Sequence, residues 1–118
     1  MSITMYTYPK CGTCRKAKKW FDDQGVAIQE IHIVENPPNK EELKKVKELS
    51  GLEWKKFFNT SGQKYRELGL KEKLPTASEE EILDLLSSDG MLIKRPLVTD
   101  GSSVTVGFKE EEFQSTWG

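Results

Sequence analysis

The sequence lacks the features of a membrane protein, a secreted disulfide scaffold or a strongly basic nucleic-acid binder. Its 118 residues contain no apolar run long enough to span a membrane, and no basic and apolar signal segment opens the chain. The 18 basic residues almost balance the 19 acidic ones, so no global electrostatic field favours nucleic acid or an acidic membrane. We therefore expect a cytoplasmic protein that makes no direct contact with nucleic acid and none with a membrane.

Cysteine and histidine are also scarce, which limits metal chemistry and disulfide crosslinking. The chain has two cysteines and one histidine, with 36% apolar and 31% charged residues. This length and composition predict one well-solvated domain over residues 1–118, with a single core that needs no disulfide staples. In a reducing compartment, a lone and closely spaced cysteine pair is more often catalytic or redox-sensing than structural.

Both cysteines lie in one stretch, Cys11-Gly12-Thr13-Cys14, between a strand-like run at residues 3–7 and a helical pattern. A strand, a Cys-x-x-Cys motif and a helix in this order are typical of thioredoxin-like redox sites. Cys11 would lie just before the helix, where unpaired backbone N–H groups and the helix dipole favour a thiolate, so it is the candidate nucleophile. Cys14, one turn inward, would be shielded and close enough to attack a mixed disulfide on Cys11, as a resolving thiol.

Two other interpretations of the cysteine pair need to be weighed. Zinc requires four ligands, but the rest of the chain offers only His32 and carboxylates, so we expect no metal site. Buried structural cysteines are the second alternative. The polar and basic setting made by Lys10, Arg15 and Lys16 suits a reactive thiol better. The pattern around His32 offers no catalytic partner and indicates a solvated or packed strand residue.

The pattern of apolar residues predicts an α/β protein with four strands. We expect strands at 2–7, 26–34, 94–99 and 104–106, a helix that follows the cysteines and ends at Gly25, and a last helix at 109–116. The final two strands would form a hairpin around a turn that contains Asp100 and Gly101. A βαβ half followed by a ββα half predicts a thioredoxin-like fold with a mixed four-stranded sheet.

A helical insertion from about residue 39 to 90 is expected between these halves. Two capping boxes, Asn39 with Glu42 and Ser78 with Glu81, would start its first and last helices. Two shorter helices are expected between them, at 53–58 and 63–68. The first helix would bury an apolar stripe made of Leu43, Val46 and Leu49.

Three motifs in this framework resemble the ArsC/Spx family of the thioredoxin superfamily. They are Cys11-Gly12-Thr13-Cys14-Arg15-Lys16-Ala17 after Tyr6-Thr7-Tyr8-Pro9, Lys94-Arg95-Pro96-Leu97-Val98, and Val106-Gly107-Phe108. The resemblance spans essentially the whole chain. It implies that Cys11 is the nucleophile and that Arg95 and Pro96 form a cis-proline loop beside it. A guanidinium there could hold a thiolate or an oxyanion.

The family contains glutaredoxin-coupled arsenate reductases and Spx-type regulators that bind RNA polymerase, and this chain departs from the reductases. Those enzymes carry further arginines that cradle the oxyanion, one in the insertion and one late in the hairpin. The corresponding segments here are Phe57-Phe58-Asn59-Thr60 and Thr105-Val106-Gly107-Phe108, without arginine. The reductases typically use one cysteine with external glutathione, whereas Spx-type members keep both cysteines as a switch.

Three hypotheses follow for the function. The first is a monomeric thiol–disulfide redox protein with a reversible Cys11–Cys14 bond, in which Arg95 acts on the thiolate and Pro96, Gly12 and Thr13 support the site. It would hold no cofactor and be recharged by glutathione, other cellular thiols, or a thioredoxin or glutaredoxin partner. The second is an Spx-like redox-sensing regulator that binds the RNA polymerase alpha subunit. The third is an arsenate reductase in which Cys11 attacks arsenic and Arg95 stabilises the adduct.

Overall fold

The computed structural model describes residues 2–118 and places four strands of this range in one mixed sheet. The strands are β1 (Ile3–Thr7), β2 (Ile28–His32), β3 (Leu97–Thr99) and β4 (Val104–Val106), in the spatial order β2-β1-β3-β4. β1 runs parallel to β2 and antiparallel to β3, and β3 pairs antiparallel with β4. The predicted thioredoxin-like α/β fold is confirmed, with β1 in the interior of the sheet.

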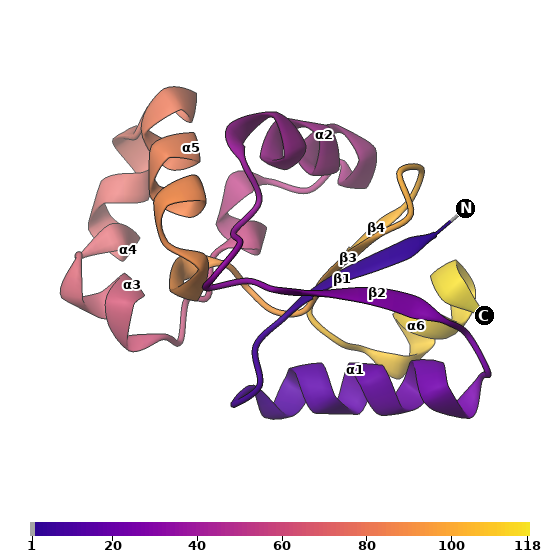
Figure 1. The fold of residues 1–118 in the computed structure, drawn as a ribbon. Helices are drawn as coiled ribbons and strands as arrows, with labels where there is room; N and C mark the ends of the chain where they lie inside the picture. The colour runs from indigo at the N-terminus through magenta and orange to yellow at the C-terminus, as the bar shows by residue number, and fades with distance from the viewer. Residues whose placement is uncertain (1) are drawn as a thin grey trace.

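Helices cover both faces of the sheet (Figure 1). On one face lie α1 (Gly12–Asp23) and α6 (Glu110–Trp117), and α2 (Lys40–Ser50) lies on the other. Successive residues of β1 enter opposite layers, because strand side chains alternate. Met5 packs with the aromatic side chains of α1 and α6, and Tyr6 packs with the α2 layer. β1 is therefore anchored from both sides just before the cysteine stretch begins.

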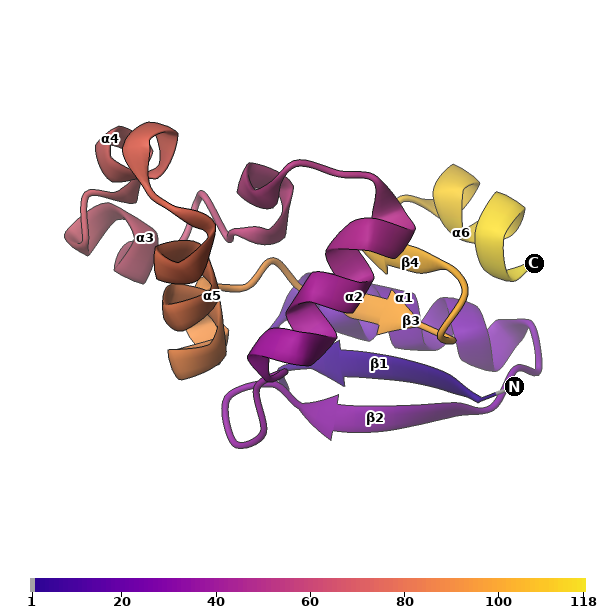
Figure 2. The same cartoon turned by 90° about the horizontal axis from the view of Figure 1, so that it is seen from above.

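The chain between β2 and β3 forms a series of short helices, here called the connecting segment (residues 40–92). After α2 come η1 (Trp54–Phe57), α3 (Gln63–Glu67), α4 (Leu70–Lys73), η2 (Leu74–Thr76), α5 (Glu79–Ser88) and η3 (Gly90–Leu92), where η marks a 3-10 helix. Figure 2 shows α3, α4 and α5 beyond the end of the sheet at which β1 and β2 finish. The segment is therefore adjacent to the end of the sheet from which α1 starts.

Backbone hydrogen bonds join the connecting segment to the approach to β3. The N–H of Asn59 donates to the carbonyl of Leu92 at 2.8 Å, and the N–H of Lys94 donates to the carbonyl of Phe57 at 2.8 Å. Phe57 and Phe58 are almost completely buried in the same core as α2 and α5. These contacts fix the course of the chain just before Arg95.

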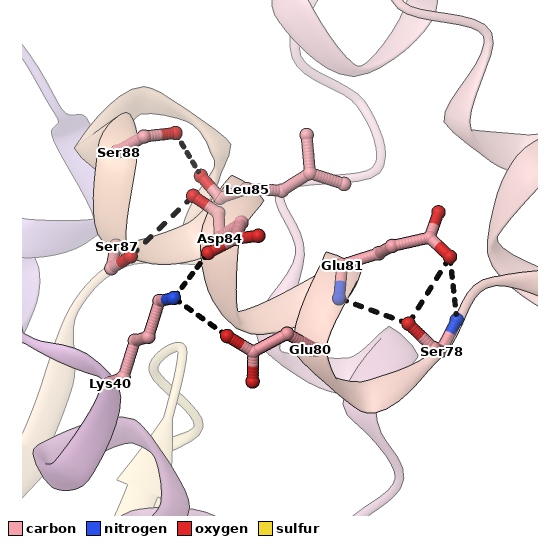
Figure 3. A network of polar contacts seen from close by, with 8 residues as sticks. All are labelled: Lys40, Ser78, Glu80, Glu81, Asp84, Leu85, Ser87 and Ser88. Carbon is pink, nitrogen blue, oxygen red and sulfur yellow. Dashed lines mark hydrogen bonds and ion pairs between the residues drawn. The ribbon is translucent and has the colours of Figure 1, made fainter.

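Both predicted capping boxes are confirmed. The N–H of Glu42 donates to Asn39 at 2.8 Å, and the N–H of Glu81 donates to the Ser78 hydroxyl at 3.2 Å. Figure 3 shows the second box together with Lys40 of α2, which reaches Glu80 and Asp84 on α5. The caps start the two longer helices of the connecting segment.

The structure corrects several details of the predicted elements. The expected strand at 26–34 is limited to Ile28–His32, and the expected helix at 53–58 is the shorter 3-10 helix η1. The helix α4 (Leu70–Lys73) was not predicted, because no helix was expected between the one at 63–68 and the one that starts at Ser78. With φ at +62°, Gly69 lets the chain reverse and start α4 at once. Leu49 was assigned to the buried stripe of α2, but it is 38% exposed.

None of the helices in residues 2–118 combines the length and the apolar character needed to cross a bilayer.

Candidate active site

Cys11 is the N-cap residue of α1. Its Sγ accepts the N–H of Cys14 at 3.4 Å, and its own N–H donates to the carbonyl of Tyr8 at 3.0 Å. The first N–H groups of a helix lack backbone partners and carry the positive end of the helix dipole. A sulfur at the N-cap satisfies one of them, and a thiolate does so better than a thiol because it carries negative charge.

The two sulfur atoms differ in exposure. Cys11 is partly exposed, whereas only 1% of the surface of Cys14 is accessible. Both are free thiols in this structure. A substrate can therefore reach Cys11, but it cannot reach Cys14 directly.

The surroundings move the two thiol pKa values in opposite directions. Burial alone would raise the pKa of Cys11, but the Cys14 thiol and N–H, together with the Arg95 guanidinium, outweigh it and lower that pKa from 9.0. Burial and the hydrogen bond to Cys11 raise the pKa of Cys14 to about 11, against the opposing hydrogen bonds from Thr7 and from the Tyr8 backbone. The favoured arrangement is a Cys11 thiolate that accepts a hydrogen bond from a neutral Cys14.

Arg95 approaches the two cysteines from the loop before β3, which is distant from them in the sequence. The Arg95-Pro96 peptide bond is cis, as the family resemblance implied, and Pro96 is buried. The Nη1 atom of Arg95 lies 3.5 Å from the carbonyl oxygen and 3.7 Å from the sulfur of Met91. Its Nε is buried and has no hydrogen-bond partner. The guanidinium thus helps to lower the pKa of Cys11 and keeps one buried donor without a partner.

Four of the six predicted site residues come together. Cys11, Cys14, Arg95 and Pro96 gather at the N-terminus of α1, where the sheet ends. Gly12 and Thr13 are exposed in the first turn of the helix. A Cβ built on Gly12 would meet only the tip of Arg15, at 4.0 Å, so space alone does not require glycine there.

His32 is a packed residue at the end of β2, one of the two environments expected for it. Its Nδ1 accepts the N–H groups of Val34 and Glu35, each at 3.3 Å. Its ring meets the Tyr8 ring edge to face, with centroids 5.6 Å apart. His32 therefore organises the turn after β2 and supports Tyr8, and its contacts do not include either sulfur.

Sequence reasoning missed three residues that shape the site: Thr7, Tyr8 and Met91. Thr7 and the Tyr8 backbone oppose the rise in the pKa of Cys14, and the Tyr8 ring lies under Arg95. The only sequence signal for Thr7 and Tyr8 is their position just before the motif. Met91 gives no such signal, because its contact with Arg95 depends on the turn at η3.

The two segments that lack the family's extra arginines are parts of the core. Phe57 and Phe58 are 0% and 1% exposed. Thr105 is 2% exposed and accepts the indole N–H of Trp117 at 3.1 Å. Neither segment brings a guanidinium to Cys11. Among residues 2–118 there is also no cluster of three or more His, Cys, Asp and Glu side chains that could hold a metal ion.

A paired-cysteine site at the end of a mixed sheet, with a cis-proline beside it, defines a thioredoxin-like protein. The family model that matches the chain narrows this class further. It is the ArsC family model, and it covers residues 6–116. The chain belongs to the ArsC family.

Individual relatives carry names of different kinds. The chain is 69% identical over 117 residues to the uncharacterized protein YusI of Bacillus subtilis, covering 99% of both chains. It is 30% identical over 114 residues to the global transcriptional regulator Spx of Streptococcus agalactiae serotype V, covering 96% of this chain and 81% of the regulator. A solved structure described as a possible arsenate reductase, from Streptococcus mutans UA159, is 49% identical and superimposes with a TM-score of 0.87, covering 95% of this chain and 97% of that one.

Proposed function

We propose that this protein is a thiol–disulfide redox protein in which Cys11 is the nucleophile and Cys14 the resolving thiol. The observation that carries the proposal is the asymmetry of the pair. The sulfur with the lowered pKa is the accessible one, and the sulfur with the raised pKa is buried beside it. A thiolate attacks and a shielded thiol waits, which is the division of roles that a two-step exchange needs.

The exchange balances as follows for a disulfide substrate. The Cys11 thiolate attacks one sulfur of the substrate, so a mixed disulfide forms and the other substrate sulfur leaves as a thiolate. Cys14 then loses its proton to that leaving thiolate or to solvent and attacks the Cys11 sulfur. The Cys11–Cys14 disulfide forms, the second substrate thiol is released, and two electrons have passed to the substrate. Cytoplasmic thiols such as glutathione, or a thioredoxin or glutaredoxin partner, would reduce the pair again.

Arg95 supports the first step of this exchange. Its guanidinium lowers the pKa of Cys11, although burial and the Cys14 contacts are larger influences. Its free Nε can also donate to the negative charge that develops on sulfur. We assign Pro96 the structural role of holding Arg95 at this end of the sheet.

Alkylation against pH tests the proposal. Iodoacetamide labelling of the reduced protein, read by mass spectrometry of the two cysteine peptides, gives the apparent pKa of each thiol. We expect Cys11 to react with an apparent pKa below that of a free cysteine, and Cys14 to stay unlabelled until the pH approaches 11. A Cys11 that titrates at or above the free-cysteine value would contradict the proposal.

The similarity to Spx supports a second candidate, a redox-sensing regulator that binds RNA polymerase. In that case the Cys11–Cys14 disulfide would be a signal, and a partner would read it. A pull-down with the C-terminal domain of the polymerase alpha subunit, using reduced and oxidised protein, separates the two. Binding that depends on the oxidation state supports the regulator, and no binding in either state removes it.

The free Nε of Arg95 favours a third candidate, an arsenate reductase, because a buried donor beside a nucleophile could hold an oxyanion. The absence of further arginines in the two core segments, 57–60 and 105–108, argues against efficient turnover. Arsenate reduction with glutathione and glutaredoxin, compared with turnover of a disulfide substrate, decides. Turnover of the disulfide alone eliminates arsenate as the substrate.

A further inference from the structure

Tyr8 contacts Cys11, Arg95 and His32 through different atoms. Its carbonyl accepts the N–H of Cys11 at 3.0 Å, and its backbone also opposes the rise in the pKa of Cys14. Its ring lies 5.3 Å from the Cζ atom of Arg95, with the guanidinium over the ring face. The same ring packs edge to face against the ring of His32. The backbone contacts are independent of the side chain, so a substitution at Tyr8 tests the ring alone.

We infer that Tyr8 is a positioning residue whose ring holds the Arg95 guanidinium in place beside Cys11. The inference rests on the proposed function, in which the Cys11 thiolate is the reactive group. It adds a second level to it, since Tyr8 would act on the sulfur only through Arg95.

The weak hydrogen bonding of Arg95 is the first argument for this role. Two long hydrogen bonds come from one nitrogen, Nη1, and both go to Met91, at 3.5 Å to the carbonyl oxygen and 3.7 Å to the sulfur. The Nε atom is buried without a partner. Guanidinium groups in folded proteins normally donate to several acceptors through N–H groups in fixed directions. Here the aromatic face supplies most of the remaining constraint, as a cation–π contact.

The support behind Tyr8 is the second argument. The His32 ring stands almost perpendicular to the Tyr8 ring, with an interplanar angle of 88°. Two backbone N–H groups, from Val34 and Glu35, fix the orientation of His32. The stack of His32, Tyr8 and Arg95 thus extends from the turn after β2 to the cis-proline loop. A ring backed in this way has a defined place, so it can define the place of the cation above it.

The charged groups around the stack are few. Cys14 faces Cys11 from α1, and Arg95 faces it from the loop before β3. His32 faces Tyr8 from the end of β2, and the Arg15 side chain reaches over Gly12 on the first turn of α1. A change in the titration of Cys11 after substitution of Tyr8 can therefore be traced to Arg95, provided that Arg15 and His32 stay in place.

The chain offers a matched control, because a second cation, Lys47, lies over an aromatic ring outside the stack of His32, Tyr8 and Arg95. The Nζ atom of Lys47 lies 5.4 Å from the centroid of the Trp54 ring, almost the same separation as in the Arg95–Tyr8 pair. Trp54→Leu removes this contact and leaves the stack at the site intact. It controls for a general effect of losing a cation–π contact on stability or dynamics.

The experiment measures the apparent pKa of Cys11 by alkylation of the full chain, for wild type, Tyr8→Leu, Tyr8→Phe and Trp54→Leu. We expect Tyr8→Leu to raise it by about half a unit, which is roughly a threefold loss of thiolate near neutral pH. Tyr8→Phe keeps the ring face and should give the wild-type value, as should Trp54→Leu. If Tyr8→Leu does not fold, Tyr8→Gln gives the same comparison.

A double substitution shows whether the effect passes through Arg95. In an Arg95→Met background, Tyr8→Leu should cause no further shift, because the cation that the ring positions is gone. An additional shift of the same size in that background would overturn the inference, and so would equal shifts in Tyr8→Phe and Tyr8→Leu. A low wild-type pKa with no shift in Tyr8→Leu overturns the inference and leaves the proposed function standing. A wild-type pKa that is not lowered overturns the proposed function itself.

Discussion

Two cations contact side chains or backbone of the connecting segment, and their surroundings are opposite. Lys40 joins α2 to α5 in the polar seam of Figure 3, where its amino group contacts Asp84 and lies 2.8 Å from Glu80. Asp84, and then Glu80, raise the pKa of Lys40 well above its usual value. Arg95 lies at the cysteine site. Its Nε is buried and lacks any partner, and it makes two long hydrogen bonds to Met91. One cation has two carboxylates in water, and the other has none in a buried setting.

This difference separates a structural charge from a chemical one. Exposed ion pairs contribute little to stability because water competes for both charges. A buried donor without a partner costs free energy, so it persists in a protein when another group uses it. At the cysteine site, the function proposed above makes the sulfur of Cys11 that group, and the guanidinium helps to lower its pKa. Lys40 instead has two carboxylate partners and lies in water-exposed surroundings, away from any reactive group.

The largest expected effects come from removing the sulfurs themselves. Cys11→Ser should abolish reaction with disulfides completely, because no other accessible thiol remains. Cys14→Ser should still react once but stop at the mixed disulfide, because the resolving thiol is gone. Mass spectrometry after treatment with a small disulfide measures the adduct. Release of the adduct from Cys14→Ser as fast as from wild type would contradict the assigned roles.

The parts of this site that were predictable from sequence are local ones. The N-cap position of Cys11 and the boxes at Asn39 and Ser78 are confirmed, because a cap is decided by residues within one helical turn. The helix α4 was not predicted, because residues within one helical turn do not decide where it begins. Its start depends on the left-handed backbone of Gly69, and sequence alone does not distinguish that from a simple break.

Contacts across long sequence separations were not predictable. The placement of Tyr8 under Arg95 joins residues that are far apart in the sequence. It exists only because β1 and β3 are neighbours in the sheet. The exposure of Leu49 likewise depends on where α2 leaves the core, which its helical spacing does not reveal. The cis bond before Pro96 came from the family resemblance, since no local pattern in the chain demands it.

Gly90 lies where the connecting segment passes the backbone just after β2. A substitution there should have the next largest effect. A Cβ at this position would lie 2.1 Å from the carbonyl oxygen and 2.7 Å from the carbonyl carbon of Ile33, which are backbone atoms. We expect Gly90→Ala to lower the free energy of unfolding by about 1–3 kcal/mol, because the turn must move away from β2. Urea denaturation measures it. Gly12→Ala is the matched control, with only the tip of Arg15 nearby, at 4.0 Å. Equal stability of both variants would refute this account of the junction.

Arg95→Met tests the second cation of the comparison, the one at the cysteine site. Without the cation, fewer interactions oppose the effect of burial on Cys11, so the pKa of that thiol should rise. An opposite charge at close range lowers a pKa by one to three units, and for a partly exposed sulfur we expect a rise of about one unit. Arg95→Lys should recover part of it. Alkylation against pH provides the measurement, and an unchanged profile in Arg95→Met would show that Cys14 and the helix alone set the thiolate.

The smallest effect is expected at Lys40, and it is the sharpest test of the contrast. Its amino group lies in water-exposed surroundings, with 43% of the side chain accessible, so Lys40→Met should leave the urea midpoint close to that of wild type at both low and high salt. The pKa of Cys11 should not change, because no contact joins Lys40 to the stack of His32, Tyr8 and Arg95. A loss of stability as large as that of Gly90→Ala would mean that the seam anchors the connecting segment after all. In that event, pairing with two carboxylates would be a structural requirement, and the distinction between the two cations would rest on the chemistry at Arg95 alone.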